Sequence, residues 1–131
     1  MKTCVYVYGS GECEQLGIEF AEDAMCEIKR AKRIPKFDMT LLEVEVKIPI
    51  CRLSVGGMHA LALTTAGTIY SWGCNDDGAL GRTGEENSPL LVQELPIKVN
   101  AISAGDCHSV AYNTDTSQAY MWGLYRVSQV L

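Results

Sequence analysis

Two histidines are the side chains of this sequence that most directly suggest chemistry. His59 follows Gly-Gly-Met, and His108 follows Gly-Asp-Cys. An imidazole can serve as a general base or as a metal ligand near neutral pH. However, Cys107 beside His108 is matched by Met58 beside His59, and no Cys-x-x-Cys pair or further His stands at metal-ligand spacing. We therefore expect two buried imidazoles that hydrogen-bond to the backbone, with no metal and no cofactor.

Charged residues recur at one place in a repeated pattern, three positions after a glycine. Glu12, Asp76 and Arg126 follow Gly9, Gly73 and Gly123. Equivalent positions of a repeat lie on the same side of a repeat protein, so these side chains should share one rim. Asp106, two residues before His108, is a further acid of interest. Such a rim could bind a charged partner, but acids at these places could also do no more than cap turns between strands.

The elements that position these residues are copies of one unit. Leu53–Gly56 returns as Ile102–Gly105, and His59 returns as His108, both 49 residues later (108 − 59 = 49). The sequence Tyr-x-Trp-Gly that ends at Gly73 returns 50 residues later, ending at Gly123 (123 − 73 = 50). The second copy therefore has one more residue than the first in the turn between its two apolar runs, which favours a β-hairpin.

A third copy opens the chain and sets the size of the unit. Residues 5–9 match residues 69–73, and Gly17 lies eight residues beyond Gly9 as Gly81 does beyond Gly73. Each unit holds about four strands in about 50 residues, the size of a propeller blade. The strands expected in the central unit are Ile50–Val55, Ala60–Leu63, Thr68–Trp72 and an outer strand near Leu90–Leu95. Their nearly continuous apolar runs suit sheets covered on both faces.

An insertion separates the first copy from the second. Residues 18–33 have helical spacing, with acids early and bases late, and Ile34-Pro35 would end a helix. Residues 42–48 alternate between apolar and charged, as an outer strand should. The cluster of Lys29, Arg30, Lys32, Arg33 and Lys36 is either a solvated helix end, a nuclear-import signal, or a contact for DNA or an acidic protein surface.

Composition bounds the class of protein. A chain of 131 residues with 47% hydrophobic residues is ordinary for about one globular domain, and the net charge of −5 argues against chain-wide binding to nucleic acid. The six cysteines form no spacing typical of zinc or disulfide frameworks, so they should be small buried hydrophobes in a reducing compartment. We expect a soluble intracellular protein, because no signal peptide or membrane span is recognisable.

Four motifs carry a family resemblance. Gly-Gly-Met-His, Trp-Gly-Cys-Asn-Asp-Asp-Gly-Ala-Leu-Gly-Arg, Ser-Ala-Gly-Asp-Cys-His and Trp-Gly-x-Tyr-Arg occur in that order. They resemble the regulator of chromosome condensation family, exchange factors for the small GTPase Ran, over residues 1–17 and 50–126. The resemblance implies an all-β fold with about two to three blades of a seven-bladed propeller, four-stranded antiparallel sheets, and a short inserted helix near 18–33. The blades would be a partial first one with the insertion (1–47), a complete one (48–97) and a truncated one (98–131).

The resemblance also implies roles for single residues. Glu12 stands where the family has an Asp on the side that faces Ran, Asp106 matches an acid implicated in exchange, and Arg126 matches an Arg at the entry to a β-wedge. An exchange factor forms no covalent bond in its substrate, so this implies no catalytic residue; the partners would be Ran and, for the full-length protein, chromatin in the nucleus. The family approaches chromatin with a basic N-terminal tail, which we do not expect here, so nucleosome binding is the weaker expectation. The scaffold residues of the repeat would be Gly9, Gly17, Gly56, His59, Trp72, Gly73, Gly81, Gly105, His108, Trp122 and Gly123.

Two other classes of function compete with exchange. The same repeats serve as interaction modules, without exchange activity, in large ubiquitin ligases and signalling proteins. A catalytic domain downstream of residue 131 would favour that class, whereas the order of the four motifs favours exchange. An independent small enzyme has no nucleophile and base, phosphate loop or metal spacing to support it.

Overall fold

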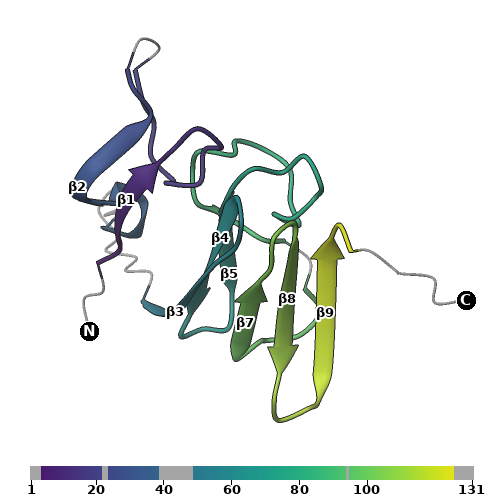
Figure 1. Cartoon of the computed structure of the whole chain (residues 1–131). Coiled ribbons are helices and arrows are strands. Elements are labelled where there is room, and N and C mark those ends of the chain that lie inside the picture. The colour runs from purple at the N-terminus through teal and green to yellow at the C-terminus, as the bar shows by residue number, and fades with distance from the viewer. Residues whose placement is uncertain (1–3, 22–23, 39–48, 94, 126–131) are drawn as a thin grey trace, which may run out of the picture.

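The computed structural model describes residues 4–21, 24–38, 49–93 and 95–125, which form three antiparallel β-sheets (Figure 1). The first sheet has the order β1-β2, the second β3-β4-β5-β6 and the third β7-β8-β9. In chain order the elements are β1 (Tyr6–Ser10), β2 (Glu27–Arg33), the short 3-10 helix η1 (Pro35–Asp38), β3 (Ile50–Val55), β4 (His59–Thr64), β5 (Ile69–Gly73), β6 (Leu90–Leu91), β7 (Ala101–Ala104), β8 (His108–Asn113) and β9 (Gln118–Gly123). Among the described residues, no helix is long and apolar enough to span a membrane.

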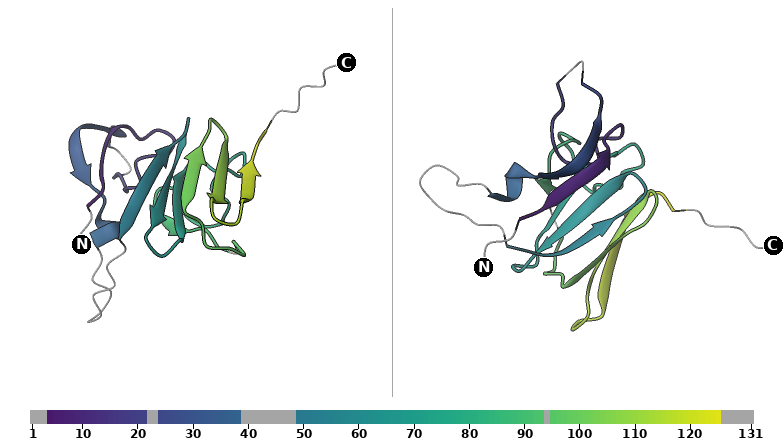
Figure 2. Two further views of the ribbon diagram at one scale, coloured as in Figure 1. Left: turned by 90° about the horizontal axis from the view of Figure 1, so that it is seen from below. Right: turned by 60° about the vertical axis from the view of Figure 1, so that its left-hand side comes forward.

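The middle sheet lies between the other two and is covered on both faces (Figures 1 and 2). All six residues of β4 are buried. Because successive side chains of a strand point to opposite faces, Ala60 and Ala62 join a core with the first sheet, whereas Leu61 and Leu63 join a core with the third. Burial of both faces thus explains the continuous apolar run of β4, and the prediction of stacked propeller sheets is confirmed.

The two complete hairpins differ by one residue in their turns. Thr64 N–H donates to the carbonyl of Thr68 at 2.9 Å, which leaves three residues in the β4–β5 turn. Asn113 pairs with Gln118, which leaves four residues in the β8–β9 turn. Gly67 (φ 81°) and Ser117 (φ 58°) take the left-handed conformation that such turns need. The hairpins predicted from the changed repeat interval are therefore confirmed.

A tryptophan and a glycine join each sheet to the next. Trp72 Nε1–H donates to the carbonyl of Gln15 at 3.0 Å, and Trp122 Nε1–H donates to the carbonyl of Ala79 at 2.8 Å. Each acceptor lies two residues before a glycine, Gly17 or Gly81. A Cβ built on either glycine would approach the indole to within 2.8 Å or less, and both glycines have a left-handed φ of 63–65°. The recurring Trp and Gly are thus two halves of one junction.

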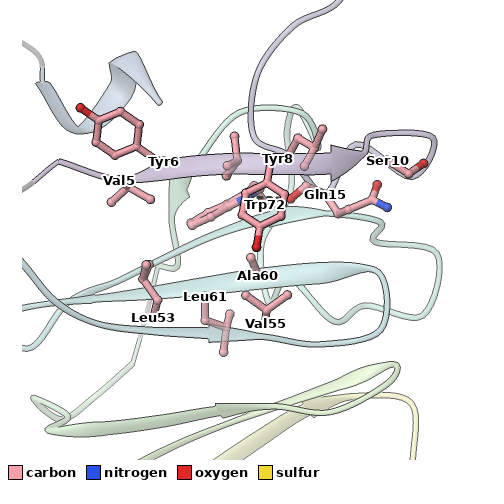
Figure 3. A pocket seen from close by; sticks show the side chains of 12 residues that line it. Val5, Tyr6, Tyr8, Ser10, Gln15, Leu53, Val55, Ala60, Leu61 and Trp72 are labelled. Atoms are coloured by element: carbon pink, nitrogen blue, oxygen red, sulfur yellow. Dashed lines mark hydrogen bonds between the residues drawn. The ribbon is translucent and has the colours of Figure 1, made fainter. Parts of the chain in front are cut away.

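The inner edge of β1 differs from that of β5, its counterpart in the middle sheet. β5 has β4 on one side and β6 on the other, whereas β1 pairs with β2 alone among the described strands. A cavity of about 270 Å³ lies between β1 and the middle sheet (Figure 3). Tyr6 and Tyr8 of β1 and Leu53 and Val55 of β3 line it and are each more than half exposed. This edge of the molecule is apolar and open.

The predicted helix near 18–33 is wrong. Residues 27–33 form β2, which pairs antiparallel with β1 from Tyr6↔Arg33 to Ser10↔Glu27. The register shifts between Val7 and Gly9, so β2 carries extra residues opposite Tyr8 and loses the strict alternation of a regular strand. Pairing with β1 satisfies backbone hydrogen bonds of β2. This outweighs the interaction of the ordered charges with a helix dipole, which would stabilise a helix by only about 0.3–1 kcal/mol per favourably placed charge.

The expected outer strands and the expected burial of the cysteines are compared with the described residues as follows. The outer strand expected near Leu90–Leu95 is the two-residue β6, and the strand expected at 42–48 lies outside the described residues. The cysteines were expected to be buried, and this is wrong. All six are free, with Cys4 and Cys51 exposed and the other four half-buried.

The glycine–tryptophan junction predicts a difference between two glycine variants. Gly81→Ala should lower the free energy of unfolding by about 1–2 kcal/mol because of the left-handed φ at this position. The overlap of the new Cβ with Trp122 should lower it by about 1–3 kcal/mol more. Gly78→Ala is the matched control, because Gly78 has a φ of 76° but its nearest neighbour lies 4.0 Å from a built Cβ. Urea unfolding measures both, and equal losses would contradict the junction.

Candidate functional site

The predicted rim residues lie in the loops that leave one end of the sheets. Glu12 follows β1, Asp76 follows β5, and Asp106 stands between β7 and β8; all three are exposed. Arg126 lies outside the described residues. In Figure 1 the arrows of β1 and β9 both end at the upper side, where these loops gather. The repeat has thus placed equivalent residues at one end of the molecule.

A glycine with positive φ ends β5 and β9, and another stands one residue before the end of β1. Gly9, Gly73 and Gly123 have φ values of 115°, 106° and 95°. After Gly73, Cys74 N–H donates to the carbonyl of Met58 at 2.9 Å, and after Gly123, Leu124 N–H donates to the carbonyl of Cys107 at 2.9 Å. A side chain at Gly73 would collide with that Met58 carbonyl and with His59. The glycines therefore turn the chain over the neighbouring strand and carry it to the rim.

Contacts between neighbouring loops make the rim continuous. Cys13 Sγ lies 3.7 Å from Met58 Sδ, which joins the loop of Glu12 to the loop before β4. Gly57 N–H donates to the carbonyl of Gly105 at 3.1 Å, which joins that loop to the loop of Asp106. The Asp106 carboxylate lies so close to Gly57 that a side chain there would overlap it. The described loops from Glu12 to Asp106 therefore form one connected surface.

The loop that carries Asp76 is held by side chains of its own. Asn75 Nδ2–H donates to the carbonyl of Arg82 at 3.0 Å, while Asn75 Oδ1 accepts from Leu80 N–H at 3.0 Å. The Glu86 carboxylate accepts from Asn75 N–H at 3.1 Å. Arg82 in turn donates to the carbonyls of Ser71 and Ser88. A loop braced in this way presents its acids in a fixed position.

Two thiols of the rim, those of Cys74 and Cys107, have raised pKa values. A side-chain hydrogen bond with Asp77 is the largest cause that raises the pKa of Cys107, and burial and nearby carboxylates add to it. For Cys74, a hydrogen bond to the Asp76 backbone would lower the pKa, but burial and the carboxylates of Asp76 and Glu86 raise it overall. Because the thiolate is the nucleophilic form, neither cysteine is poised for covalent chemistry. Among the described residues, no group of three or more His, Cys, Asp or Glu could hold a metal ion.

Asp77 is a rim residue that sequence reasoning missed. Its carboxylate, in the loop that follows β5 of the middle sheet, lies beside Cys107 of the next repeat and is the largest cause of the raised pKa of that thiol. Its neighbour Asp76 drew attention because it occupies an equivalent place in each repeat, whereas Asp77 has no charged equivalent after Gly9 or Gly123. The signal that could have found it is the pair of adjacent acids at 76 and 77.

His59 joins two sheets instead of facing a ligand. It is 1% exposed, and its Nε2 lies 2.8 Å from Ser109 Oγ. Ser109 donates its one hydroxyl proton to the carbonyl of Ala79 at 2.8 Å, so His59 Nε2 must carry the proton and donate to Ser109. The expected backbone partner is therefore wrong, since the partner is a hydroxyl of the next repeat. His108, the equivalent residue, is half-buried beneath Gly105.

Comparisons with known proteins agree with this architecture. Two models described as regulator of chromosome condensation (RCC1) repeat match residues 50–79 and 66–112. The regulator of chromosome condensation of Drosophila melanogaster is 41% identical over 128 residues, which cover 95% of this chain. The human protein of that name is 37% identical over 125 residues, which cover 93%. The chain belongs to the regulator of chromosome condensation family.

Solved members of the family share the fold of the described sheets. Prp20p of Saccharomyces cerevisiae, studied for its binding to Gsp1p and histones, is 32% identical with a TM-score of 0.75, and the match covers 95% of this chain. The match covers 29% of Prp20p, 21% of the Drosophila regulator and 26% of the human one. This chain therefore spans about a fifth to under a third of the length of these relatives.

The buried imidazole predicts how stability depends on pH. Burial, and next the nearby His108, lower the pKa of His59 below its ordinary value of 6.5, while Asp106 opposes them. The unfolded chain then binds a proton that the folded chain does not, so stability is full above about pH 6.5 and falls as the pH falls below it. The slope should approach about 1.4 kcal/mol per pH unit for one proton.

The test compares urea unfolding at pH 7.5 and pH 5.5 for the wild type and His59→Gln. The variant should be less stable at pH 7.5, because it loses the bond to Ser109, and should lose less stability on acidification. An unchanged loss between the two pH values would show that His59 is not the group responsible.

Proposed function

We propose that this chain is part of a guanine-nucleotide exchange factor for the small GTPase Ran, and that its acidic rim contacts the GTPase. The observation that carries this proposal is the continuous surface from Glu12 to Asp106, assembled from loops of three sheets. Family membership supports the proposal, as does the studied binding of Gsp1p by Prp20p.

A rim of fixed acids suits exchange because exchange is a shift in binding equilibrium. A protein that binds the nucleotide-free GTPase better than the loaded one weakens nucleotide binding by the same factor. Asp76 and Asp106 would compete with the nucleotide phosphates for the cationic groups of the GTPase and for its magnesium ion. The protonated thiols beside them fit a surface that binds and forms no covalent bond.

The division into repeats supports the same proposal. Residues 1–47 would contribute a partial blade, residues 48–97 a complete blade and residues 98–131 a partial one. The two-, four- and three-stranded sheets of the described residues support this division. In the complete protein we place the remaining blades beyond these sheets, with Arg126 at the rim, chromatin as a further partner and the nucleus as the compartment.

A second candidate function is an interaction module without exchange activity. The human E3 ubiquitin-protein ligase HERC2 is 43% identical over 72 residues, which cover 53% of this chain. The match with the regulators of chromosome condensation covers 93–95% of the chain, so exchange remains the preferred proposal.

The rim predicts a binding difference between two aspartate variants. Asp106→Asn should weaken binding of the 131-residue chain to nucleotide-free Ran by about fivefold, since one exposed charge contact contributes up to about 1 kcal/mol. Asp115→Asn is the control, because Asp115 is an exposed acid in the β8–β9 turn, at the other end of β8 from Asp106. Surface plasmon resonance compares them, and equal affinities would contradict the proposed rim.

We expect this chain to bind Ran without accelerating nucleotide exchange. We expect no acceleration of the release of fluorescent GDP from Ran by the chain alone, because the described loops make up only part of a rim. Acceleration close to that of a full-length regulator would contradict this expectation. Failure of the chain to bind nucleotide-free Ran would favour the interaction module.

A further inference from the structure

The outer strand of the first sheet differs from its counterpart in the middle sheet. The counterpart, β6, has only the two residues Leu90 and Leu91. β2 has seven residues, Glu-Ile-Lys-Arg-Ala-Lys-Arg, of which four are Lys or Arg. A two-residue apolar strand therefore suffices to complete a sheet of this repeat. The added length and the cations of β2 are not needed by the repeat and require another explanation.

Three of the four cations of β2 face solvent: Lys29, Arg30 and Lys32 are all exposed, whereas Arg33 is half-buried. Lys29 Nζ lies 4.0 Å from a Glu27 carboxylate oxygen, with side chains 81% and 47% exposed, and such an exposed pair contributes little. In a chain with 16 acids and 11 bases, this strand is a local reversal of charge. It offers a binding surface for an anionic ligand.

Within the described part of the chain, the backbone of β2 has an unpaired edge as well. In its sheet β2 pairs with β1 alone among the described strands, so the N–H and C=O groups of its outer edge have no partner strand there. Figure 1 shows β2 at the end of the molecule opposite β9. Other β-strands can pair with such an edge, and an extended peptide can add to it as a further strand.

A groove continues from this strand toward the middle sheet. It has a volume of about 450 Å³, and its lining includes Lys32, Glu19, Ile18, Pro35 and Asn87. Asn87 Oδ1 is buried and has no hydrogen-bond partner within the described part of the chain. The groove thus combines one cation and one acid with apolar surface for a methylene stem and an amide oxygen that lacks a donor.

We propose that the outer edge of β2 binds an extended acidic peptide as an added strand. The peptide backbone pairs with the free edge, its carboxylates pair with Lys29, Arg30 and Lys32, and one side chain enters the groove beside Lys32. A nucleic acid fits less well, because a phosphodiester chain cannot pair with backbone N–H and C=O groups in alternation.

The test uses an eight-residue fluorescein-labelled peptide of alternating glutamate and valine, with the 131-residue chain and fluorescence anisotropy. The triple variant Lys29→Gln, Arg30→Gln, Lys32→Gln should bind about tenfold more weakly, as expected for the loss of three exposed charge contacts. Lys98→Gln removes an exposed cation outside β2 and should bind as the wild type does. The same peptide with alternate backbone nitrogens methylated, which keeps its charge, should lose binding at least tenfold.

Three outcomes would overturn the proposal. These are equal binding of the methylated peptide, which would show attraction by charge alone, equal binding by the triple variant, and tighter binding of a single-stranded oligonucleotide with the same number of charges. Thermal melts confirm that each variant folds. If the triple variant does not fold, Lys32→Gln replaces it with an expected loss of about threefold, and unchanged affinity of that variant overturns the proposal.

Discussion

The carbonyl oxygen of Ala79 is the point at which the middle and third sheets are joined. It accepts the Trp122 indole N–H and the Ser109 hydroxyl, both at 2.8 Å, and Ser109 accepts in turn from His59. Every member is at least half-buried, so a missing partner would leave a polar group without water. Glycine at 81 is required because the indole occupies the place of a side chain. The stacking of one repeat on the next therefore depends on a small network of side chains as well as on apolar burial.

The position of the rim follows from this stacking. Once the sheets are in register, the glycines that end β5 and β9 send their loops over neighbouring strands by matching hydrogen bonds. Asp106 then lies over Gly57, and Asp77 reaches Cys107, each across a boundary between sheets. The rim acids come from different repeats, and only the stacking of those repeats brings them together. The same packing buries the imidazole of His59 against Ser109.

The sequence predicted the repeated parts of this fold and not the parts that occur once. The changed interval between His59 and Trp72 and their copies placed the hairpins correctly, since one register governs both copies. β2 has no long counterpart among the described strands, and its bulge against β1 obscures the alternation that would identify a strand. The hydroxyl partner of His59 could not be predicted, because Ser109 meets it only when two sheets stack. Asp77 was missed because it has no charged equivalent in the other repeats.

The central claim is that side-chain hydrogen bonds between repeats hold the sheets in register. A double-mutant cycle between His59→Ala and Ser109→Ala, measured as free energies of unfolding at pH 7.5, tests it most directly. The structure predicts a coupling energy of about 1–2 kcal/mol between the two positions, as expected for a buried hydrogen bond within a network. Additive losses, with a coupling energy near zero, would show that apolar packing alone joins the repeats and would contradict the account.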